Sequence, residues 1–100
     1  MKQITAAELK QRIDAGEKLN IIDVREPAEY AEYNMGGKLI PLGQIMGMQL
    51  EELEDLRNEE VILHCKGGTR STQAGLMLEQ AGFTNVVNLT GGIMAWKQLG

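Results

Sequence analysis

Four short apolar runs alternate along the chain with segments of helical spacing, and this alternation restricts the fold more than any other feature of the sequence. The runs cover residues 20–24, 38–40, 61–64 and 86–89. Each has the length of a buried strand and is too short for a buried helix. Strands that alternate with helices form parallel sheets covered by helices on both faces. The sequence therefore predicts an α/β domain with a twisted, mainly parallel sheet of about five short strands and helices on both faces.

Helix signals fill the segments between these runs. Thr5 and Glu8 have the spacing of a capping box, Gly16 follows as a helix stop, and Pro27 suits the first turn of a second helix. We expect helices between residues 5 and 16, from 27 to 33, from 48 to 56, from near 70 to 82, and after 92. No internal repeat or linker divides the chain, so we expect residues 1–100 to form a single domain.

The acidic balance of the sequence argues against two classes of partner. The chain has 10 Lys and Arg against 14 Asp and Glu, a net charge of −4. Nucleic acids and anionic membranes bind basic faces, so we expect no nucleic acid and no membrane as a partner. No apolar stretch approaches the roughly 18 residues of a membrane helix, and the start MKQITAAELKQ has no signal-peptide core. Because the single cysteine also excludes an internal disulfide, we expect a cytoplasmic protein.

The single cysteine, Cys65, follows the third apolar run within the sequence HCKGGTRS. Ligands of parallel sheets gather at the carboxyl ends of strands. Gly67 and Gly68 permit a tight loop whose amides turn inward, and the helix that begins near Arg70 directs its positive end to the same point. Lys66 and Arg70 add positive charge. These features favour the thiolate and predict a lowered pKa for Cys65, which would make it a nucleophile.

A lone cysteine also has a plainer interpretation, as a small buried hydrophobic residue. The two glycines and two cations beside Cys65 favour instead a reactive thiol in a partly exposed setting. His64 is its neighbour on a strand and points to the opposite face, so we expect His64 to be structural, hydrogen-bonding beneath the loop. One cysteine and one histidine cannot fill a zinc site, and we expect no metal.

The loop from Cys65 to Ser71 resembles the active-site loop of single-domain rhodaneses, the thiosulfate and persulfide sulfurtransferases. Other blocks resemble the same family in the expected order along almost the whole chain: IDVREP at 22–27, IPL at 40–42, AGF at 81–83 and GGxxAW at 91–96. The resemblance implies a rhodanese-like fold.

The resemblance also implies a mechanism without a cofactor. Cys65 would attack the outer sulfur of a small anionic donor, thiosulfate or a persulfide, and hold it as a covalent persulfide. Cyanide or a thiol would then remove that sulfur. Lys66 and Arg70 would hold the donor. The backbone amides that would cradle the anionic sulfur are those of Lys66, Gly67, Gly68, Thr69, Arg70 and Ser71.

Residues outside the loop are given supporting roles by the same resemblance. Asp23 and Arg25 would brace the loop, with Asp23 structural rather than catalytic, since a carboxylate touching the thiolate would raise the pKa of the thiol. The segment from Tyr33 to Leu42 departs from the family pattern GHIPGAxNIPL. Asn34 replaces its histidine, the inner proline is missing, and the segment is one residue shorter. The preference for donor and acceptor therefore stays open.

Two alternatives to a free-standing enzyme remain. The domain could be a persulfide carrier or a regulatory module with little thiosulfate turnover, which exchanges sulfur with a relay protein. A related phosphatase or arsenate reductase is disfavoured, because those loops follow the pattern HC-x5-R. Here four residues separate Cys65 from Arg70, and the smaller ring suits one added sulfur and would crowd a phosphate.

Overall fold

The computed structural model describes residues 1–100 and contains one sheet of five parallel strands. The strands lie in the order β1-β5-β4-β2-β3. Their bounds are β1 Lys2–Ile4, β2 Ile21–Asp23, β3 Lys38–Leu39, β4 Val61–His64 and β5 Val86–Leu89. The prediction of an α/β fold with a parallel sheet of about five short strands is therefore confirmed.

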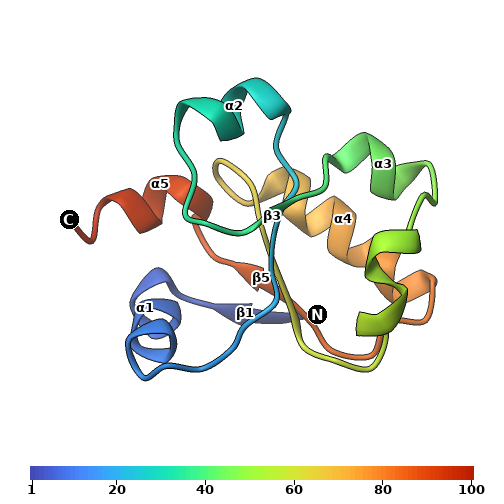
Figure 1. The fold of residues 1–100 in the computed structure, drawn as a ribbon, viewed down its shortest axis with the longest axis horizontal. Helices are drawn as coiled ribbons and strands as arrows, with labels where there is room; N and C mark the ends of the chain where they lie inside the picture. Colours follow the sequence, from blue (N-terminus) through green and yellow to red (C-terminus); the bar gives the residue numbers. More distant parts are fainter.

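Helices cover both faces of this sheet (Figure 1). Their bounds are α1 Ala6–Asp14, α2 Pro27–Glu32, α3 Leu42–Met46, the 3₁₀ helix η1 Glu51–Leu56, α4 Thr69–Gln80 and α5 Gly92–Lys97. Helices α1 and α5 lie on one side in Figure 1, and α3, η1 and α4 lie on the other. Helix α2 lies beyond the edge of the sheet, and none of its residues is buried.

Two hydrophobic clusters fix these layers. The larger packs residues of β2 and β4 such as Ile22, Val61 and Leu63 against α3, η1 and α4, and it includes Cys65. The smaller packs Ile62 and its neighbours in β1 and β5 against α1 and α5. Alternate residues of β4 thus point to opposite faces.

Three elements differ from the predictions, and one of them, α3, was not predicted. Strand β1 was not among the predicted runs, because only Ile4 of its three residues is buried. The helix predicted at 48–56 is wrong in its first three residues and in its type. Met48 has a left-handed φ of 60°, which interrupts the chain between α3 and η1. Only residues from Glu51 onward are helical in that stretch, and they form a 3₁₀ helix.

The parallel arrangement brings the carboxyl ends of β2, β4 and β5 to one edge of the sheet. The loop after β4 carries Cys65, and Arg25 follows β2 at the same edge. No helix in the structure has the length and apolar character needed to cross a membrane.

Candidate active site

The loop after β4 turns directly into α4, and Gly68 makes this turn possible. Gly68 is the N-cap of α4 and has a φ of 116°, a region that other residues rarely adopt. Gly67 has no positive φ and has open space around its Cα, so the expectation of a special backbone angle holds for one of the two glycines. Thr69, the first residue of α4, is exposed.

The amides of this turn converge on the sulfur of Cys65. The Gly68 amide donates to Sγ at 3.1 Å, and the Ser71 amide donates to it at 3.4 Å. The Ser71 hydroxyl lies 3.5 Å from the same sulfur. The predicted nest of inward-facing amides is therefore present at two of the six predicted positions, Gly68 and Ser71, as hydrogen bonds to the resting sulfur.

Cys65 is more deeply buried than expected. Only 1% of its surface is exposed, so the expectation of a partly exposed thiol is wrong for this structure. The reason is that the side chain points into the layer between β4 and α4, beneath its own loop. Burial raises the pKa of the Cys65 thiol. The hydrogen bonds that Ser71, Gly68 and Gly67 provide at the sulfur lower the pKa by more than burial raises it, so it lies below its ordinary value.

Helix α5 holds the loop backbone from the other side. The amide of Ile93 donates to the carbonyl of Cys65 at 2.8 Å, and the amide of Met94 donates to the carbonyl of Lys66 at 3.2 Å. Gly92 is essential to this approach, because a Cβ there would lie 2.5 Å from both carbonyl oxygens. With its carbonyls bound to α5, the peptide chain presents its next amides to the sulfur.

Arg70 is paired with an acidic residue that was not among the predicted site residues. Its guanidinium binds both carboxylate oxygens of Glu29 on α2, at 2.7 and 2.9 Å. The hydrogen bonds from Arg70 lower the pKa of Glu29 to about 2. Glu29 thus occupies the fork of Arg70, whereas Lys66 is exposed and forms no ion pair. The expected role of both cations in holding a donor stays a prediction. The sequence feature that could have indicated the Glu29–Arg70 pair is Glu29 itself, which follows the IDVREP block two residues after Pro27.

Asp23 and Arg25 do not brace the loop directly. Arg25 donates to the Asp23 carboxylate through its amide and guanidinium, and to the carbonyl of Tyr33 at 2.7 Å. No hydrogen bond joins either residue to residues 65–71. The pair instead ties the end of β2 to the segment after α2, since the short side chain of Asp23 is saturated by Arg25.

His64 is buried as expected but lacks the expected hydrogen bonds. Neither ring nitrogen has a partner, and Nε2 lies 3.8 Å from an oxygen of Asp23. Arg25 donates to that carboxylate, and the imidazole lies too far from it for a hydrogen bond. Burial lowers the pKa of His64, which favours the neutral ring, and so His64 cannot supply a proton to Cys65 from the opposite face of β4.

The segment that departs from the family pattern is organised by its own side chains. Asn34 donates to the carbonyl of Tyr30 at 3.0 Å and accepts from the amide of Gly36 at 2.9 Å. Gly37 lies against Ile21, where a Cβ would stand 2.8 Å from the Ile21 carbonyl oxygen. These contacts give the shortened segment a compact course beside β2.

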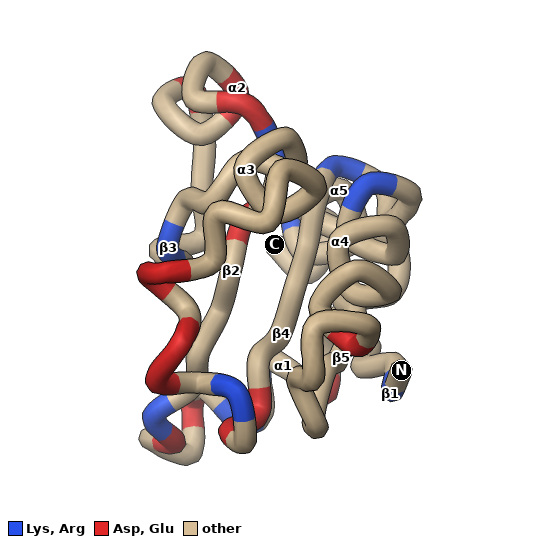
Figure 2. Tube along the Cα trace, turned by 90° about the vertical axis from the view of Figure 1, so that its right-hand side faces the viewer, with Lys and Arg blue, Asp and Glu red and all other residues tan.

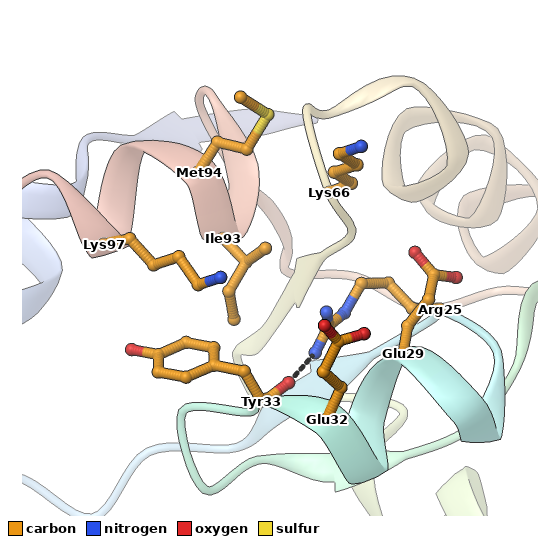
Figure 3. A pocket seen from close by; sticks show the side chains of 8 residues that line it. All are labelled: Arg25, Glu29, Glu32, Tyr33, Lys66, Ile93, Met94 and Lys97. Atoms are coloured by element: carbon orange, nitrogen blue, oxygen red, sulfur yellow. Dashed lines mark hydrogen bonds between the residues drawn. The ribbon is translucent and has the colours of Figure 1, made fainter.

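A cavity of about 250 Å³ lies beside the loop, between α2 and α5 (Figure 3). Its lining residues are Arg25, Glu29, Glu32, Tyr33, Lys66, Ile93, Met94 and Lys97. In Figure 3 the Lys97 ammonium points into the space that the Arg25 guanidinium faces from the other side. Lys97 also lies 4.5 Å from the centre of the Tyr33 ring. Figure 2 shows acidic residues on α2 and basic residues near α4 and α5.

Ser71 connects the sulfur to a polar pair that was not predicted. Its hydroxyl lies 2.5 Å from Oδ1 of Asn88 on β5, and Asn88 donates to Gln3 on β1 at 3.0 Å. No group of three His, Cys, Asp or Glu side chains gathers closely enough to hold a metal ion. The absence of a metal or cofactor from the chemistry stays a prediction.

Curated relatives share most of the length of this chain. It is 42% identical over 97 residues to the probable adenylyltransferase/sulfurtransferase MoeZ of Mycobacterium tuberculosis, with 95% of the chain and 24% of that protein covered. It is 39% identical to the putative sulfurtransferase YtwF of Bacillus subtilis, with 97% and 91% covered. The chain thus spans about a quarter of MoeZ and nearly all of YtwF.

Solved structures have the same fold. The rhodanese-like domain protein from Staphylococcus aureus has a TM-score of 0.82 and 37% identity, with 96% of this chain and 91% of that chain covered. The family of rhodanese-like domains matches residues 5–99. With the Cys65 loop, the parallel sheet and these matches in agreement, the chain belongs to the family of rhodanese-like domains.

Proposed function

We propose that this chain is a sulfurtransferase that carries a sulfane sulfur on Cys65 between a small anionic donor and a thiophilic acceptor. The observation that supports this most directly is the convergence of the Gly68 and Ser71 amides on Sγ. Two fixed donors at a buried sulfur favour its anionic form, which is the attacking species. The names of the relatives MoeZ and YtwF agree with this reaction class.

The reaction consists of two displacements at sulfur. The Cys65 thiolate attacks the outer sulfur of thiosulfate, a new S–S bond forms, the S–S bond of thiosulfate breaks, and sulfite leaves with the electron pair. The acceptor then attacks the terminal sulfur of the Cys65 persulfide and releases the thiolate. With cyanide the product is thiocyanate, and with a thiolate it is a new persulfide. Each step is a nucleophilic substitution and needs no cofactor.

The charges around the loop suit an anionic donor. Lys66 is exposed and unpaired beside Cys65, and Lys97 and Arg25 line the adjoining cavity. The Glu29–Arg70 pair is electrically neutral, so Lys66 supplies the nearest free positive charge on the loop. A donor dianion would be drawn to this side of the loop.

A carrier role is a second candidate, and the burial of Cys65 favours it. A thiol that is 1% exposed must be reached through its loop, which suits a partner that opens the loop more than a freely diffusing donor. One relative, YrkF of Bacillus subtilis, is named a putative sulfur carrier protein, and this chain spans 50% of its length. The physiological donor, acceptor and relay partner belong to this part of the proposal.

Intact-mass analysis tests the proposal. After incubation with thiosulfate we expect the mass to rise by one sulfur atom, and after cyanide we expect the gain to disappear with release of thiocyanate. The Cys65→Ser variant should show neither change. A gain with a persulfide donor and none with thiosulfate would select the carrier role. Hydrolysis of an aryl phosphate, without sulfur uptake, would replace the proposal with a phosphatase.

A further inference from the structure

Ser71 has three hydrogen-bond neighbours and a single hydroxyl proton. The hydroxyl oxygen lies 2.5 Å from Oδ1 of Asn88, 3.1 Å from the carbonyl oxygen of Gly68 and 3.5 Å from Sγ of Cys65. Ser71 is fully buried and Asn88 is 5% exposed. Water therefore cannot donate to whichever of these neighbours does not receive the Ser71 proton. The direction of this proton therefore affects the sulfur.

The Asn88 amide faces Ser71 with its oxygen and Gln3 with its nitrogen. Asn88 Nδ2 donates to Oε1 of Gln3 at 3.0 Å, and the Thr90 hydroxyl donates to the same oxygen at 3.1 Å. Oδ1 of Asn88 consequently points at Ser71. An amide oxygen only accepts, so at 2.5 Å the Ser71 hydroxyl must be the donor. The lone pairs of Ser71 are then the part that faces Sγ.

We propose that Asn88, held by Gln3, is a positioning residue that turns the Ser71 proton away from Cys65 and leaves the stabilisation of the sulfur anion to the backbone amides. In this arrangement the thiol S–H of Cys65 donates to the Ser71 oxygen. The inference deepens the proposed function, on which its meaning for sulfur transfer rests. An attacking thiol works best with a pKa near ambient pH, because very acidic thiols give weakly nucleophilic thiolates. The Gln3–Asn88–Ser71 network limits how acidic Cys65 becomes.

Titration of the thiolate by its ultraviolet absorbance tests this inference. In Asn88→Leu, a side chain of similar volume removes the acceptor, and the Ser71 proton can turn to the charged sulfur. We expect the midpoint of thiolate formation to fall by about one pH unit. The pH dependence of alkylation by iodoacetamide should shift by the same amount.

Two further variants separate positioning from general disturbance of the fold. In a Ser71→Ala background the Asn88→Leu change should leave the midpoint where Ser71→Ala alone puts it, since there is no hydroxyl to redirect. Gln3 is exposed, so Gln3→Met will fold even if Asn88→Leu does not. It should lower the midpoint by a smaller amount, because the Asn88 amide is then free to turn.

Two results would overturn the inference. One is an unchanged or raised midpoint in Gln3→Met and in folded Asn88→Leu, which would mean that Ser71 already donates to the sulfur. The other is an equal fall with and without Ser71. Sulfur uptake by the parent protein is measured on the same samples. Its failure would count against the proposed function and leave the titration result standing.

Discussion

His64 and Cys65 are consecutive residues at the end of β4 whose side chains lie on opposite faces of the sheet. They differ in the hydrogen-bond donors that each side chain meets there. Both are almost completely buried, at 0% and 1% exposure. Cys65 receives two backbone amides at its sulfur, whereas neither nitrogen of His64 has a partner. Burial favours the neutral form of each group. For His64 this means a lowered pKa and a neutral imidazole. For Cys65 burial alone would raise the pKa, but the donors at its sulfur reverse the effect, so its pKa is also lowered and the thiol is more acidic.

The loop, and not burial or the strand, therefore lowers the pKa of the Cys65 thiol. The loop in turn depends on α5, whose amides bind the carbonyls of Cys65 and Lys66. A change that pushes α5 away should affect Cys65 and leave the surroundings of His64 unchanged. A change at His64 should do the reverse.

The largest expected effect comes from Gly92→Ala. Gly92 has a φ of 60°, and the new Cβ would meet the carbonyl oxygens of Cys65 and Lys66 at 2.5 Å. We expect the free energy of unfolding in urea to fall by about 3 kcal/mol and the uptake of sulfur to be lost. The matched control is Gly67→Ala in the same loop, which has open space and should change stability by less than about 1 kcal/mol. Equal effects of the two variants would show that α5 does not hold the loop.

An intermediate effect is expected from His64→Leu. The replacement removes two nitrogens that have no hydrogen-bond partner, so stability at neutral pH should be unchanged or rise by up to about 2 kcal/mol. The pKa of His64 is lower in the folded than in the unfolded protein. The unfolded state therefore binds more protons as the pH falls below the ordinary value of 6.5, and the native protein loses stability there.

Urea unfolding between pH 7 and pH 5 measures this contribution. The parent protein should lose stability as the pH falls, and His64→Leu should lack that part of the loss while it still takes up sulfur on Cys65. A large loss of stability at neutral pH, or a loss of uptake, would mean that His64 supports the loop after all.

The smallest effect is expected from Glu29→Gln, which breaks the bidentate pair with Arg70. Both side chains are about one-third exposed, at 31% and 32%, so the free energy of unfolding should fall by only about 0.5–1 kcal/mol. The freed guanidinium then adds positive charge beside Lys66, and the KM for thiosulfate should fall. Glu32→Gln on the same helix has no ion pair to break and serves as the control. A higher KM in Glu29→Gln would show that the pair itself positions the donor.

The alternation of apolar runs and helix signals was sufficient to predict the sheet, because buried parallel strands have a strong apolar signature. It missed β1, an edge strand with one buried residue, and the short helix α3. It also began the helix of η1 too early, at Met48, because a left-handed Met48 has no signal in the sequence. The loop of Cys65 and its turn were predictable from local sequence, since the turn at Gly68 needs a glycine.

The partners of the loop were harder to predict. Glu29, Asn88 and Gly92 come from three other segments, and each reaches the loop only through the tertiary fold. Asp23 is structural as expected, but Asp23 and Arg25 hydrogen-bond each other and make no hydrogen bond to the loop.

The most direct test of the account is the pKa of Cys65 in the parent protein, measured by thiolate absorbance with Cys65→Ser as the baseline. We expect a midpoint below 9.0, the ordinary value of the thiol, because the contacts of the sulfur with Ser71 and with the amides of Gly68 and Gly67 outweigh burial. A midpoint at or above that value would mean that burial dominates, and Cys65 would then be a buried thiol and not an activated nucleophile.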